Sequence, residues 1–206
     1  EMTSSLVGSE MCIRDRESTV PYVSPETSGW SQESCNMLNN YLFGVNETVR
    51  EYVRLTQELD ARDTPVVLVL FGDHKPWMGN GGSVYEEMGI DFDTSTLAGF
   101  RNYYATPYLI WANRAAKEVL GADFTGDGGD FSPCFLMTRL FDACGWAGPG
   151  YMQLSRAMRD ISPLLHTNGL FLHDGVLTSV LSDTDRSFYR SWLAVQYYRE
   201  HVAAYS

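Results

Sequence analysis

The residues in this sequence best suited to chemistry are the neighbours Asp73 and His74. They follow six consecutive apolar residues, Val66–Phe71, and a single glycine, Gly72. A short apolar run of this kind predicts a strand buried on both faces, as in a parallel sheet covered by helices. Ligands of open α/β sheets bind beyond the carboxyl ends of the strands. A carboxylate and an imidazole at that place can both bind a divalent metal.

Other polar and aromatic side chains near this pair have two interpretations each. The ammonium group of Lys75 can meet a substrate phosphate, and Trp77 can form the wall of a pocket. A solvated lysine and an aromatic side chain packed under a loop are the alternatives. For His166 and His173 no partner can be named, and we expect them to be surface or hydrogen-bonded histidines.

Two motifs carry a resemblance to a known family. The segment VLVLFGDHKPW, residues 67–77, resembles the strand and metal-binding turn of the lipoteichoic acid synthase family, within the sulfatase and alkaline-phosphatase-like superfamily. The segment YYATPYLIWAN, residues 103–113, is similar to a strand that follows that turn in the family. The resemblance covers the chain from about Thr19 to its end. It implies the C-terminal part of an α/β catalytic domain, with a partial alkaline-phosphatase-like sheet covered by helices and a C-terminal hairpin and helix.

The resemblance also implies a function. Members of the family transfer or cleave phosphoester or sulfate-ester groups with a threonine nucleophile bound to a divalent metal. The metal lowers the pKa of the nucleophile, orients it and neutralises the charge that develops on the phosphoryl oxygens. Asp73 and His74 would be two metal ligands, with manganese the expected metal. The substrate would be a glycerophospholipid or an anionic cell-envelope polymer. A sulfatase or phosphoethanolamine transferase of the same superfamily is one alternative, and a non-catalytic binding module is another.

The resemblance places several functional parts upstream of Glu17. These are the nucleophilic threonine, a glutamate ligand and the helices that anchor a catalytic domain outside the bacterial cell membrane. We therefore expect a parent enzyme but an inactive isolated chain. Residues 1–16 resemble a translated sequencing adapter and are set apart from the domain, residues 17–206. Either Thr19 occupies the place where the family has a substrate-facing histidine, or the junction with the adapter-like segment has altered that residue.

Composition and charge limit the partners. The 206 residues can form one domain with a core, and no apolar run is long enough to span a bilayer. The net charge of -11 argues against nucleic acid as a partner. We expect this chain alone to be soluble.

Periodicity and cap residues predict the remaining elements. The helix expected over Asp183–Val202 carries an apolar stripe that includes Phe188 and Trp192, and we expect this stripe to pack on the sheet. The expected elements are a helix over Ser31–Leu59, a strand over Thr106–Ala112, a helix over Arg114–Leu120 ended by Gly121, a helix from Ser132–Pro133 to Cys144, a hairpin around Asp174–Gly175, and a helix over Asp183–Val202.

Overall fold

The computed structural model describes residues 21–201 of the chain. The adapter-like segment 1–16 and Thr19 lie outside these residues. The described chain divides into two compact units. Among the described residues, the first unit contains 21–62 together with Gly72–Pro107, and the second contains Asp63–Phe71 together with 108–201. Each unit has helices and its own buried cluster of apolar side chains.

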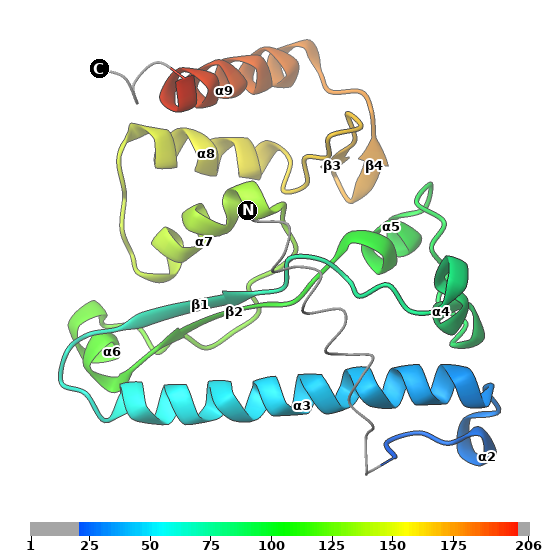
Figure 1. Cartoon of the computed structure of the whole chain (residues 1–206). Helices are drawn as coiled ribbons and strands as arrows, with labels where there is room; N and C mark the ends of the chain where they lie inside the picture. The colour runs from blue at the N-terminus through cyan, green and yellow to red at the C-terminus, as the bar shows by residue number, and fades with distance from the viewer. Residues whose placement is uncertain (1–20, 202–206) are drawn as a thin grey trace. The chain divides into compact units, whose positions relative to one another are not determined.

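The first unit is built around one long helix, α3, shown in blue to cyan in Figure 1. The Ser31 hydroxyl caps it by accepting a hydrogen bond from the Ser34 amide, as the sequence predicts. Leu38 of α3 packs against Val84 and Tyr85 in the core of this unit. The elements of the unit are α2 (Pro25–Ser28), α3 (Gln32–Asp60), a 3₁₀ turn η1 (Asn80–Gly82), α4 (Ser83–Glu87) and α5 (Leu97–Tyr104).

The second unit contains both sheets and the remaining helices of the described residues. Its core is formed by Phe135, Met158 and Trp192, and α8 and α9 lie side by side (Figure 1). The elements are β1 (Val67–Phe71), β2 (Tyr108–Ala112), α6 (Arg114–Leu120), a 3₁₀ turn η2 (Pro133–Phe135), α7 (Leu136–Ala143), α8 (Gly150–Ile161), β3 (Phe171–His173), β4 (Val176–Thr178) and α9 (Asp183–His201).

The central strands differ from the sequence prediction. β1 and β2 form a two-stranded antiparallel pair, in which Val67 lies opposite Ala112 and Phe71 opposite Tyr108 (Figure 1). The prediction of a parallel sheet with β1 buried on both faces is therefore wrong. The β1 residues before Phe71 are only partly buried, and 63% of Phe71 is exposed. An apolar run reports a preference for burial but carries no information about the direction of the partner strand.

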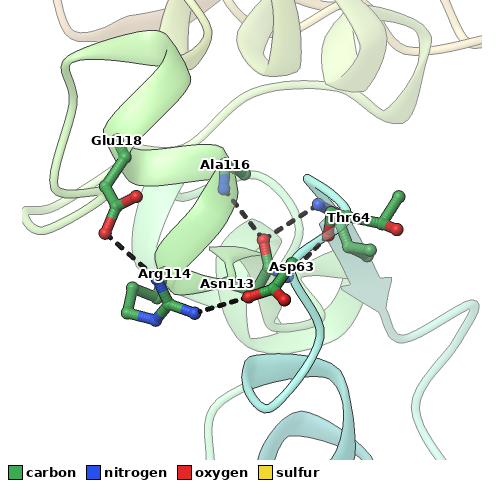
Figure 2. A network of polar contacts seen from close by, with 7 residues as sticks. Asp63, Thr64, Asn113, Arg114, Ala116 and Glu118 are labelled. Carbon is green, nitrogen blue, oxygen red and sulfur yellow. Dashed lines mark hydrogen bonds and ion pairs between the residues drawn. The ribbon is translucent and has the colours of Figure 1, made fainter.

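The start of β1 is joined to α6 by the buried side chain of Asn113 (Figure 2). Its Oδ1 accepts hydrogen bonds from the Val66 and Ala116 amides, each at 2.9 Å, and its Nδ2 donates to the Thr64 carbonyl at 2.9 Å. This one side chain caps α6 and fixes the entry into β1. Gly121 ends the helix with φ 64, as predicted.

The C-terminal elements confirm the predicted hairpin and helix. Asp174 and Gly175 have φ 49 and φ 77 between the antiparallel strands β3 and β4, as a type I′ turn requires. The stripe on α9 packs mainly on helices rather than on the central sheet, because Trp192 contacts Phe135 of η2 and donates to Ser155 of α8. The predicted packing of this helix on a sheet is therefore wrong for Trp192.

The predicted helix start at Ser132–Pro133 is also corrected. A 3₁₀ turn comes first, and the Ser132 side chain makes no cap hydrogen bond. Its hydroxyl instead donates to the Leu165 carbonyl at 3.0 Å and accepts from the Leu165 amide at 2.8 Å. The Ser132 hydroxyl, which the local pattern assigns to the helix cap, is therefore hydrogen-bonded to the main chain of a residue far along the sequence. Across residues 21–201 no helix is long and apolar enough to cross a membrane.

Candidate metal-binding turn

The residues Gly72–Trp77 form an exposed turn directly after β1. Gly72 donates its amide to the Pro107 carbonyl at 3.0 Å, so backbone pairing continues to the first residue of the turn. Asp73 and His74 follow, with 71% and 62% of their side chains exposed. The turn thus places both predicted ligands at the carboxyl end of a strand, with access for a metal ion and for substrate.

The two side chains face each other. The His74 amide donates to Oδ1 of Asp73 at 2.8 Å, which fixes the orientation of the carboxylate. Oδ2 of Asp73 lies 3.6 Å from Nε2 of His74. The atoms available to bind a metal are therefore neighbours on the same side of the turn.

A second contact determines which nitrogen of His74 is free. Nδ1 lies 3.1 Å from the Lys75 carbonyl oxygen. A carbonyl only accepts hydrogen bonds, so this contact requires a proton on Nδ1 and leaves the lone pair of neutral His74 on Nε2. Metal-binding histidines are commonly held by a hydrogen bond from the other ring nitrogen to a backbone carbonyl.

The separation of these atoms fits one shared metal ion. Two ligands bound at about 2.1 Å with tetrahedral geometry would lie roughly 3.4 Å apart. The observed 3.6 Å between Nε2 of His74 and Oδ2 of Asp73 is close to that value. A carboxylate oxygen and an imidazole nitrogen suit zinc, manganese and similar divalent ions. The donor set therefore fits the predicted metal, and further ligands would have to come from outside this pair.

The other two predicted site residues lie on the same turn. Lys75 is half-buried and contributes its backbone carbonyl to His74. Trp77 is 70% exposed, so the alternative of an aromatic side chain packed under a loop does not describe it. Its indole is available to a ligand that approaches the turn.

A second His–Asp pair, which the sequence reasoning did not identify, lies in the β3–β4 hairpin. Nε2 of His173 is 3.7 Å from Oδ2 of Asp174, and its Nδ1 lies 3.1 Å from the Ile161 carbonyl oxygen. The adjacency of the two residues in the sequence was the available signal. Within the described part of the chain, neither pair belongs to a group of three or more His, Cys, Asp or Glu residues that could hold a metal.

Comparisons with protein-family models, curated proteins and solved structures found no match. The family resemblance of the two motifs therefore stays a prediction. The structure shows the local geometry of the turn, in which Oδ2 of Asp73 and Nε2 of His74 are neighbours.

Proposed function

We propose that the turn Gly72–Trp77 supplies two ligands to a divalent metal in an enzyme that transfers or hydrolyses phosphoester groups, related to the lipoteichoic acid synthases. The observation that carries the proposal is the arrangement of Asp73 and His74. Both free donor atoms face the same point, at a separation that suits one metal ion. The quoted motifs around Gly72 and Thr106 support the choice of superfamily.

Each residue of the turn has a role in this proposal. Oδ2 of Asp73 and Nε2 of His74 would hold the metal, and the contact of Nδ1 with Lys75 orients the imidazole ring. A bound manganese ion would supply Lewis-acid stabilisation of the phosphoryl oxygens. The Lys75 ammonium would attract the anionic substrate, and the exposed Trp77 indole would contact its glycerol or lipid portion.

The substrate class follows from the same resemblance. A glycerophospholipid or an anionic cell-envelope polymer carries the phosphodiester on which such a site acts. The enzyme would then work at the outer face of the bacterial cell membrane. The negative charge of the chain is compatible with an anionic substrate, because a bound cation reverses the sign of the local field.

We also propose that β1 and β2 are part of a larger, alkaline-phosphatase-like sheet. Both strands are apolar along their whole length, yet Phe71 is 63% and Leu109 50% exposed. A two-stranded sheet is marginal in water without further strands or covering helices. Further strands would pair with the edges of β1 and β2, and helices covering the larger sheet would bury these side chains.

Titration with Mn²⁺ tests the metal assignment, and the second His–Asp pair provides a matched control. We expect Asp73→Ala and His74→Ala to weaken Mn²⁺ binding about tenfold or more, measured by the enhancement of water proton relaxation. His173→Ala and Asp174→Ala should leave the affinity unchanged. The assignment is wrong if the variants of the hairpin pair lose binding instead, or if neither set of variants changes it.

A further inference from the structure

The turn that carries Asp73 and His74 is held at both ends by side chains from elsewhere in the same unit. At its start, Oγ1 of Thr106 donates to the Gly72 carbonyl oxygen at 2.7 Å. At its end, the Tyr85 hydroxyl donates to the Pro76 carbonyl oxygen at 2.6 Å. Both contacts are short hydrogen bonds to main-chain oxygens.

The contact at the start of the turn is close-packed as well as hydrogen-bonded. A Cβ atom at Gly72 would lie 3.0 Å from Cβ of Thr106, so the threonine side chain rests directly on the glycine. The backbone pairing of Gly72 with Pro107 lies beside this contact. Thr106 therefore fixes the residue immediately before Asp73.

The contact at the end of the turn comes from the core. Tyr85 is 8% exposed, packs with Leu38 and Val84, and has its ring 5.0 Å from that of Phe92. Burial, followed by the neighbouring Tyr41, raises the pKa of Tyr85. The phenol stays protonated as a donor at neutral pH. A buried side chain has little freedom, so it anchors Pro76 firmly.

These anchors matter because the side chains of the two candidate ligands are oriented through the main chain of the turn. The side chains of Asp73 and His74 are mostly exposed, and packing does not restrict their rotamers. Their mutual orientation depends on the His74 amide and on the Lys75 carbonyl. Both groups belong to the main chain of the turn. Whatever fixes that main chain fixes the two donor atoms.

We propose that Thr106 and Tyr85 are positioning residues, which hold the turn so that Oδ2 of Asp73 and Nε2 of His74 face one metal ion. The proposal deepens the function proposed above and rests on it for the metal. It assigns a role to the threonine of the YYATPYLIWAN segment, which the family resemblance leaves without one. Neither residue touches the metal or the substrate in this role.

Two substitutions test the proposal, each with a matched partner. Thr106→Val keeps the shape and removes the hydroxyl, while Thr106→Ser retains the donor. Tyr85→Phe removes the anchoring hydroxyl, while Tyr103→Phe removes a hydroxyl from the same aromatic cluster, in which Tyr103 contacts Phe92. Circular dichroism establishes that each variant folds. If Thr106→Val does not fold, Tyr85→Phe against Tyr103→Phe decides.

The first readout is metal affinity. Loss of one hydrogen bond should weaken Mn²⁺ binding about fivefold in Thr106→Val and in Tyr85→Phe. Thr106→Ser and Tyr103→Phe should bind like the unsubstituted chain. If Asp73→Ala abolishes binding but both hydroxyl deletions bind normally, the positioning role is refuted while the metal site stands.

The second readout needs no metal. Long-range ¹H–¹⁵N NMR at a pH where imidazole is neutral, about pH 8, reports which nitrogen of His74 carries the proton. We expect the proton of His74 on Nδ1 in the unsubstituted chain and a mixture of the two tautomers in Thr106→Val. In Thr106→Ser the proton should again be on Nδ1. An unchanged tautomer in Thr106→Val and Tyr85→Phe overturns the proposal, even if no metal binds and the proposed function itself fails.

Discussion

Replacing Asn113 by alanine should be among the most damaging single changes in the second unit. The side chain is fully buried, accepts hydrogen bonds from the amides of Val66 and Ala116, and donates one to the carbonyl of Thr64 (Figure 2). Alanine can replace none of them. The substitution at once removes the cap of α6 and the connection to the start of β1.

The cost can be worked out contact by contact. Loss of an asparagine cap costs about 1 kcal/mol. The Val66 amide is partly buried, and leaving it without an acceptor adds about 1–2 kcal/mol. Thr64 is exposed, so its carbonyl can turn to water and adds only about 0.5 kcal/mol. The free energy of unfolding should therefore fall by about 3 kcal/mol.

Urea unfolding followed by far-UV circular dichroism and tryptophan fluorescence measures this change. Asn113→Asp should lose less, about 1–2 kcal/mol, because a carboxylate still accepts from both amides but faces the Thr64 carbonyl without a donor. Asn36→Ala is the control, since that exposed side chain accepts a hydrogen bond from the neighbouring Gln32 on the surface of α3, and it should stay within about 0.5 kcal/mol. A loss in Asn113→Ala no larger than in this control would show that Asn113 does not hold α6 to the start of β1.

Three further predictions concern other parts of the chain, and urea unfolding measures each. Burial alone would raise the pKa of Asp142, but hydrogen bonds and charge from two arginines of α8 outweigh it and hold the pKa below its usual range. This stabilisation is present above the unfolded pKa of about 3.9 and is lost as pH falls through the folded pKa, so Asp142→Asn should cost about 2 kcal/mol at pH 7 and progressively less as the pH falls below about 3.9. Trp192→Phe should cost about 1–2 kcal/mol because it leaves the buried Ser155 hydroxyl without its 3.0 Å donor, and the further loss on adding Ser155→Ala should then be small. Gly99→Ala should cost about 2 kcal/mol or more, since its Cβ would collide with a backbone carbonyl, whereas Gly44→Ala in open space within α3 should stabilise the chain by about 0.5–1 kcal/mol.

The parts of the fold that local chemistry specifies were predictable. Ser31 begins α3, Gly121 ends α6, and Asp174–Gly175 forms the hairpin turn, as expected. In each case the residue satisfies a need of its own neighbours along the chain, such as a free amide or a positive φ. Such needs are visible in a few consecutive residues.

The parts of the fold that depend on residues far apart in the sequence were not predictable. The partner of β1 is set by pairing with β2, far along the chain, and its direction leaves no trace in the apolar run itself. The Ser132 hydroxyl is bound by Leu165 instead of capping a helix. Helix α8 was missed for a different reason. Its apolar residues Tyr151, Leu154, Met158 and Ile161 recur every three or four positions, so periodicity could have found it.

The two His–Asp pairs show how much of the metal assignment depends on context. Their side-chain separations, 3.6 Å and 3.7 Å, are almost equal, and each histidine has Nδ1 close to a backbone carbonyl. Adjacency in the sequence therefore produces this side-chain separation readily, and the turn that holds Asp73 and His74 is what sets this pair apart. The difference lies in the backbone. Asp174 is part of a two-residue turn with 92% of its side chain exposed, whereas the turn at Asp73 is fixed at both ends by other side chains.

If Mn²⁺ bound both His–Asp pairs equally, adjacency in the sequence would be enough to form a metal site, and the hydrogen bonds from Thr106 and Tyr85 would be irrelevant to metal binding. Preferential binding at Asp73 and His74 would show that a preorganised backbone, rather than residue type, makes the site.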